Sequence, residues 1–154
     1  FALVPLLDPR RENVRRSKGL LLSAWVGAVG VVALAHGAIV LAAINGAEPD
    51  IRIIATGIGA LLIAIGNFMA KSRSSWFLGF RTPWTLSSEH AWVAANRTGG
   101  WLLVLTGAGT IAAAWLSAPR DGFLVLAAGL MTTLVAGIAV SYFAWRADPE
   151  KQTG

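Results

Sequence analysis

The chain has 154 residues, of which 55% are hydrophobic and only 14% are charged. A soluble domain usually has about a quarter of its residues charged, so this composition excludes an ordinary soluble globular protein. The net charge of +5 would also suit a nucleic-acid binder. We expect no direct nucleic-acid contact, because basic residues also gather on the cytoplasmic side of membrane proteins.

Charged residues are absent from four long stretches of the sequence, residues 19–47, 53–70, 98–119 and 122–145. A helix that crosses a hydrocarbon core about 30 Å thick needs roughly 20 apolar residues, at a rise of about 1.5 Å each. The sequence therefore predicts an all-α protein, a single polytopic membrane helix bundle over residues 1–154. Its four complete transmembrane helices are expected at about 19–45, 52–70, 99–117 and 123–145.

The first residues of the chain predict a further helix. Residues 1–7 are apolar but too short to span a membrane, and Pro9 follows them where a helix would have to end. The segment has neither the basic leader nor the small-residue cleavage site of a signal peptide. We expect residues 1–7 to be the tail end of an earlier helix, with more protein preceding residue 1.

The basic residues predict the orientation of the bundle. Eleven of the 13 fall on one side of the predicted spans: Arg10, Arg11, Arg15, Arg16, Lys18, Lys71, Arg73, Arg81, Arg97, Arg146 and Lys151. Only Arg52 and Arg120 fall on the other side. Since basic residues mark the cytoplasmic side, the loop of residues 71–98, here called the motif loop, and the C-terminus are expected in the cytoplasm.

Within the predicted spans, small residues stand four apart, as at Ala33 and Gly37 or at Gly137 and Ser141. This spacing favours close helix packing, either within the chain or with a second subunit. His36 is the ionisable residue within the spans, and we expect it to be neutral and bonded to a neighbouring helix backbone. A metal site would need three or four ligands, and the chain has no cysteine. We therefore predict no metal, no cofactor and no enzymatic activity.

The motif loop carries residues with specific backbone preferences. Gly79 permits a tight turn, and Pro83 holds Thr82 extended. Ser87 is a good N-cap for an interfacial helix near 88–98, with Glu89 in its first turn. At helical spacing, Trp92, Asn96 and Gly100 would form one stripe. Two interpretations remain open, a well-anchored elbow or a rigid, aromatic-lined pocket around Arg81.

The run Gly79-Phe80-Arg81-Thr82-Pro83-Trp84-Thr85-Leu86, followed by Trp92 and Arg97, resembles the signature of the SdpI family of bacterial membrane immunity proteins. Gly66-Asn67 also resembles the family's Gly-Asn at the end of a span. Two positions depart from the family pattern. Ser75 stands where the family commonly has Asn, and Asn96 stands where it has His.

The resemblance implies a membrane protein that binds rather than catalyses, in the bacterial cytoplasmic (inner) membrane. Family members protect a producing cell against a secreted killing peptide, and some hold a repressor protein at the membrane. The implied partners are thus a peptide toxin, a repressor protein and membrane lipids. The implied site residues are Asn67, Gly79, Arg81, Thr82, Pro83, Trp84, Thr85, Trp92, Asn96 and Arg97.

Two other functions remain open. The chain would suit an accessory or structural subunit of a larger membrane complex, since its small-residue faces could receive other helices. It would also suit a small lipid-binding or transport protein, for which His36 and Arg81 are the candidate residues.

Overall fold

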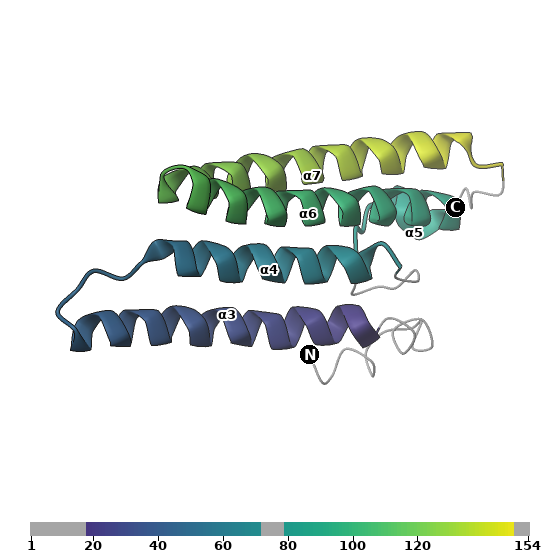
Figure 1. The fold of residues 1–154 in the computed structure, drawn as a ribbon. Coiled ribbons are helices and arrows are strands. Elements are labelled where there is room, and N and C mark those ends of the chain that lie inside the picture. The colour runs from purple at the N-terminus through teal and green to yellow at the C-terminus, as the bar shows by residue number, and fades with distance from the viewer. Residues whose placement is uncertain (1–17, 72–78, 150–154) are drawn as a thin grey trace.

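The computed structural model describes residues 18–71 and 79–149. Its elements are the helices α3 (Lys18–Ile44), α4 (Ile51–Met69), α5 (Pro83–Ser87), α6 (Glu89–Leu116) and α7 (Pro119–Ala147) (Figure 1). All of them except α5 are long and apolar enough to cross a membrane. The prediction of an all-α bundle with four membrane-spanning helices is confirmed. The predicted helix end at residues 1–7 lies outside the described residues.

The four long helices pack in chain order, α3 on α4, α4 on α6, and α6 on α7. α5 packs against α6 and α7. Among the described helices, α3 contacts α4 alone. The start of α3, the end of α4, α5 and the end of α7 lie at one end of the bundle (Figure 1). The described part of the motif loop, from residue 79 onward, therefore sits on the α6–α7 side of that end.

Short turns join the helices at the opposite end. Asn45 and Gly46 form a turn after α3, and Gly46 has a φ of +63°. Asp50 then caps α4 by accepting a hydrogen bond from the Arg52 backbone N–H at 2.9 Å. Residues 119–122 form the first turn of α7, with Pro119 as its first residue. Proline suits the first helical position, because the N–H it lacks would have no intrahelical partner there.

The interfacial helix predicted near 88–98 is not a separate element, because α6 runs unbroken from Glu89 to Leu116. Its N-cap is Ser88 rather than Ser87, since the Ser88 hydroxyl accepts from the Ala91 N–H at 3.0 Å. No proline interrupts residues 89–116, so nothing in the backbone forces a bend at the membrane boundary. The first turns of α6 therefore continue straight beyond the uncharged part of the helix.

Glycine allows α4 and α6 to touch backbone to backbone. A Cβ placed on Gly66 would lie 2.5 Å from the Gly100 carbonyl oxygen, and one on Gly59 would lie 2.6 Å from that of Gly107. Apolar bulk gives helices no driving force to associate in lipid, whereas close backbone approach does. By contrast, a Cβ on Gly37 of α3 would meet nothing within 4 Å. The small residues therefore serve internal packing in α4 and α6, but not in this part of α3.

Candidate functional site

The described part of the motif loop begins with a glycine that the backbone requires. Gly79 has a φ of +87°, a conformation that side chains with a Cβ rarely adopt. The Asn96 side chain and the Trp92 ring lie directly against its α-carbon, so that a Cβ there would collide with Asn96 Oδ1. The turn predicted at Gly79 is thus confirmed, and α6 shapes it.

Asn96 fastens this turn to α6. Its Oδ1 accepts a hydrogen bond from the Phe80 N–H at 2.8 Å, and its Nδ2 donates to the Trp92 carbonyl at 3.0 Å. Asn96 is 1% exposed and Trp92 is fully buried. The predicted stripe of Trp92, Asn96 and Gly100 is buried as a whole. Asn96, which departs from the family pattern, therefore makes an internal contact that holds the loop in place.

Two threonines fix the next turn of the loop. Thr82 is extended, as Pro83 predicts, and caps the short helix α5. The Thr82 hydroxyl accepts from the Thr85 N–H at 3.2 Å, and the Thr85 hydroxyl accepts from the Thr82 N–H at 2.9 Å. This reciprocal arrangement satisfies donors that a helix start leaves open. Thr85 is 1% exposed, so its side chain stabilises the loop from inside and does not contribute to the loop surface.

The same segment is also tied to α7. The Thr82 hydroxyl donates to Ser141 Oγ at 3.1 Å, and Ser141 Oγ donates to the Ile138 carbonyl at 2.7 Å. The Trp84 ring meets Tyr142 edge to face, with 5.3 Å between the ring centroids. Hydroxyl and aromatic contacts therefore hold the loop from α7, as Asn96 holds it from α6.

A further contact closes the same end of the bundle. Ser88, at the start of α6, donates its hydroxyl to the carboxylate of Asp148, which follows α7. Both residues are buried. Sequence reasoning did not assign Ser88, Asp148 or Tyr142 to this site, and it named Ser141 only as a small residue for helix packing. Contact partners about 60 positions apart give no local signal, although two adjacent serines before Glu89 did indicate a cap.

Arg81 does not lie in a pocket of aromatic side chains. It is exposed, whereas Trp92 is fully buried and Trp84 is half-buried against Tyr142. The pocket prediction around Arg81 is therefore wrong. Aromatic rings gain more by packing between helices, while a guanidinium remains hydrated outside. The elbow interpretation fits better, with Arg81 on its surface.

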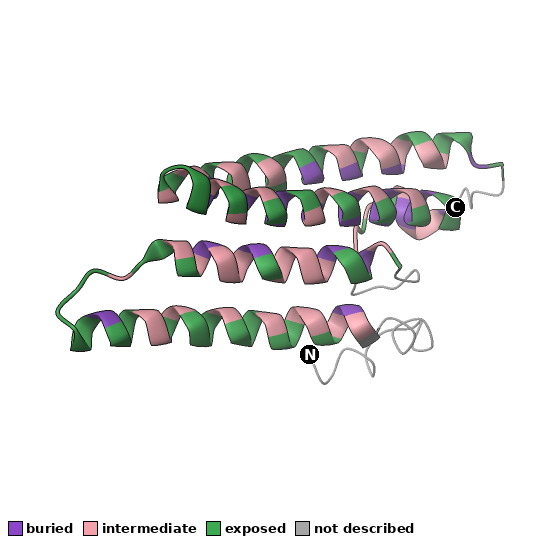
Figure 2. Ribbon diagram, in the orientation of Figure 1, coloured by how far each residue is buried: buried purple, intermediate pink, exposed green. Residues whose placement is uncertain are grey.

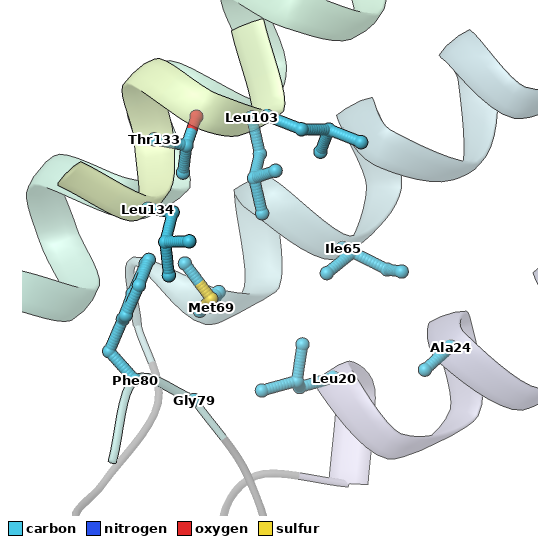
Figure 3. Close-up of a pocket in the computed structure, with 10 residues that line it drawn as sticks. Leu20, Ala24, Ile65, Met69, Gly79, Phe80, Leu103, Thr133 and Leu134 are labelled. Atoms are coloured by element: carbon cyan, nitrogen blue, oxygen red, sulfur yellow. The ribbon is translucent and has the colours of Figure 1, made fainter. Parts of the chain in front are cut away.

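Phe80 closes one end of an apolar groove with a volume of about 460 Å³ (Figure 3). Its ring lies against Gly137 of α7, where a Cβ would stand 2.6 Å from the ring. Leu20 and Ala24 of α3, Ile65 and Met69 of α4, Leu103 of α6 and Leu134 of α7 line the groove. A groove of this composition can receive hydrocarbon but offers little for a polar ligand.

The other predicted site residues are exposed. Pro83 lies on the loop surface, whereas Asn67 and Arg97 lie on a recess between α4 and α6. Lys71 donates to Asn67 Oδ1 at 3.3 Å on that recess. The ten residues thus separate into a buried or half-buried set that braces the loop and an exposed set on two surfaces. Ser75 lies outside the described residues.

His36 lies on the outer face of α3, exposed and without a hydrogen-bond partner among the described residues. Among the described helices it does not make the predicted bond to a neighbouring helix backbone, because α4 packs on the other face. Within residues 18–71 and 79–149, no group of three His, Cys, Asp or Glu could hold a metal ion.

Residues 71–143 match the SdpI/YfhL protein family. Immunity protein SdpI of Bacillus subtilis (strain 168) is 42% identical over 55 residues, which are 36% of this chain and 27% of that relative. The match thus spans far less than two thirds of the curated relative. No solved structure matches the chain. With its four apolar helices, the chain is a multi-pass membrane protein, and its part from residue 71 to residue 143 is similar to the SdpI/YfhL protein family.

Proposed function

We propose that the chain is an immunity-type binding protein of the bacterial cytoplasmic membrane that presents the motif loop to the cytoplasm. The match to an immunity protein supports the activity. The described basic side chains support the orientation, because Lys71, Arg81, Arg97 and Arg146 share the loop's end. Arg52 and Arg120 are at the other end. Basic residues accumulate on the cytoplasmic side.

The observation that carries the proposal is that buried hydrogen bonds fix the loop while leaving Arg81 outside. Before Arg81, Asn96 accepts from the Phe80 N–H and Thr85 donates to the Phe80 carbonyl; after Arg81, the Thr85 hydroxyl accepts from the Thr82 N–H. A guanidinium on a fixed backbone loses little conformational entropy when it binds a carboxylate or phosphate. Arg81 is thus the proposed contact for an anionic partner such as an acidic surface of a repressor protein, with Trp84 beside it as the aromatic contact.

The proposed mechanism is binding. The protein binds a peptide toxin that reaches it from outside the membrane or from within it. Toxin binding changes the surface that the loop presents to the cytoplasm. Asn96 replaces the family's histidine at a buried position. The proposal therefore assigns partner recognition to the exposed Arg81 and to Trp84, and assigns Asn96 and Trp92 to support.

The test expresses the full chain in Bacillus subtilis that lacks its own immunity protein and is exposed to its own killing peptide. Survival is compared for the wild type, Arg81→Ala and Arg146→Ala, with the amount of inserted protein measured in the membrane fraction. Loss of a central arginine contact costs about 2 kcal/mol or more, about a thirtyfold loss in affinity. We expect Arg81→Ala to abolish protection and Arg146→Ala to retain it. Full protection by an inserted Arg81→Ala protein would refute the role of Arg81.

A second candidate function is that of an accessory subunit in a larger membrane complex, and His36 favours it. Polar side chains within membranes almost always face a bundle interior or a partner, yet His36 faces outward from α3. Purification in a mild detergent should then recover a fixed partner with the wild type and lose it with His36→Leu. Absence of any stoichiometric partner would exclude this function.

A further inference from the structure

A second recess, separate from the apolar groove, lies between the end of α4 and the first half of α6. Its volume is about 310 Å³. Asn67 and Lys71 contribute from α4, and Arg97 and Trp101 contribute from α6. Its rim therefore joins two cations, an amide and an indole, while Val93 and Val104 supply apolar walls.

The floor of this recess is rigid because the two helix backbones meet there. A Cβ on Gly100 would stand 2.6 Å from the Gly66 carbonyl oxygen and 2.9 Å from Ala70 Cβ. Lys71 comes shortly after Gly66, just past the end of α4, and Arg97 comes shortly before Gly100 on α6, so the crossing sets the distance between their backbones. The recess is thus a built feature of the α4–α6 interface.

The recess carries positive charge without a compensating acid. No Asp or Glu lines it. Among the described residues, the Arg97 guanidinium makes no hydrogen bond or ion pair, and the Lys71 ammonium donates only to Asn67 Oδ1 at 3.3 Å. That bond leaves the Asn67 Nδ2 as a further donor. Glu89 stands on the same helix but about 12 Å before Arg97, at about 1.5 Å per residue.

The recess also lies at the depth of lipid headgroups. From residue 98 to Leu116, α6 carries no charge, and this segment is about 28 Å long at the helical rise per residue. That length matches the hydrocarbon core, which places Arg97 at its edge. Lys71 follows the end of α4 at the same level. Trp101 is 61% exposed, as suits an indole at the membrane interface.

We propose that this recess is a binding site for the headgroup of an anionic phospholipid. Its phosphate would accept hydrogen bonds from the Arg97 guanidinium, which can bind two oxygens at once, and from the Lys71 ammonium. Asn67 Nδ2 adds a third donor. The adjoining acyl chain runs past Trp101 and Val104 along the surface of α6. This site does not depend on the proposed immunity function, and Arg81 is not part of it.

The experiment uses the full chain, purified in a mild detergent, with equal amounts of phosphatidylglycerol and phosphatidylcholine added. Native mass spectrometry measures which lipid the protein retains. Each basic residue near an anionic lipid surface contributes about a fivefold gain in affinity. We expect the wild type to prefer phosphatidylglycerol, with the preference falling about fivefold in Arg97→Gln and further in Lys71→Gln/Arg97→Gln. Arg146→Gln removes the same charge at the same end of the bundle and should leave the preference unchanged.

Folding is checked for every variant by circular dichroism, and the charge-conserving pair Lys71→Arg/Arg97→Lys should retain the preference. A wild type without preference would overturn the proposal, as would an Arg146→Gln loss equal to that of Arg97→Gln, which would mark unspecific charge attraction. In a third arm, inorganic phosphate is added to the protein that has phosphatidylglycerol bound. If it displaces phosphatidylglycerol completely at millimolar concentration, the recess is a free-phosphate site and the lipid assignment is wrong.

Discussion

The described part of the motif loop and the start of α3 lie at the same end of the bundle, but the loop and α3 are attached to it by different means. The described loop, from residue 79 onward, is tied to α6 through Asn96 and to α7 through Thr82. No hydrogen bond of a described α3 side chain reaches another helix, and the Ser23 hydroxyl, for example, bonds the Leu20 carbonyl on α3 itself. Buried positions concentrate on α6 and the loop, whereas α3 is mostly exposed (Figure 2).

This difference shows what holds a helical membrane protein together. Lipid is as apolar as a leucine side chain, so association depends on close packing and on polar contacts. α6 has both, with glycine–carbonyl approaches to α4 and hydrogen bonds to the loop. At its start, α3 packs Gly19 against the Phe68 ring, a side-chain contact that can adjust. We therefore expect substitutions around the loop to cost much more stability than equivalent substitutions in or next to α3.

The largest expected effect is that of Gly79→Ala, with Gly46→Ala as its control. Both glycines have positive φ, but a Cβ at Gly46 meets nothing within 4 Å. The left-handed backbone costs an alanine about 1–2 kcal/mol at either position. At Gly79 the collision with Asn96 adds about 1–3 kcal/mol of overpacking. Thermal unfolding in one detergent should show a larger drop in unfolding temperature for Gly79→Ala than for Gly46→Ala. Equal drops would show that the contact with Asn96 adds nothing to the stability of the loop.

A second pair of glycines tests the packing of the spans. In Gly66→Ala the new methyl group meets the Gly100 carbonyl oxygen at 2.5 Å, a backbone atom that cannot move alone. We expect a loss of about 2 kcal/mol. In Gly37→Ala the methyl enters open space, so that a gain of up to about 1 kcal/mol in helix propensity remains. A destabilised Gly37→Ala protein in the same unfolding assay would show that the outer face of α3 is covered.

The hydrogen bond that fixes the loop to α6 is tested by Asn96→Ala. Removal of the Asn96 amide leaves the part-buried Phe80 N–H without its acceptor, which costs about 1–3 kcal/mol. Asn67→Ala is the control, because Asn67 is exposed and, in the described part of the chain, its side chain bonds Lys71 alone. Limited proteolysis should detect the opened loop in Asn96→Ala alone. If both proteins are cleaved at the same rate, Asn96 does not hold the loop.

The sequence predicted the spans because the thickness of the hydrocarbon core requires a minimum length of uncharged helix. The stripe of Trp92, Asn96 and Gly100 followed from helical periodicity. The division between an interfacial helix and a span was wrong, because the membrane boundary at Arg97 leaves the backbone hydrogen bonds of α6 intact. The length of an uncharged span and the period of a helix are local properties, which can be read directly from the sequence.

The candidate site was harder to predict than the fold. The run from Gly79 to Leu86 identified the family, but the residue types did not tell which side chains face inward. Trp92 and Thr85 are suited to binding and also to internal packing, and the structure buries both. The choice depends on partners such as Ser141, which lies 59 positions from Thr82. The recess at Lys71 and Arg97 likewise exists only once α4 and α6 cross.

The smallest expected effect concerns the hydroxyl pair that ties the loop to α7. Thr82→Ser keeps the hydroxyl that meets Ser141 Oγ at 3.1 Å, whereas Thr82→Val removes it and also removes the cap of α5. We expect Thr82→Val to lose about 1–2 kcal/mol and Thr82→Ser to lose less. Ser141→Ala separates the two contributions, since it removes the α7 contact but leaves the cap. Ser141→Ala could unfold at the wild-type temperature while Thr82→Val unfolds at a lower one. In that case the cap of α5 alone accounts for the effect of Thr82, and α7 holds the loop through the contact of Trp84 with Tyr142 instead.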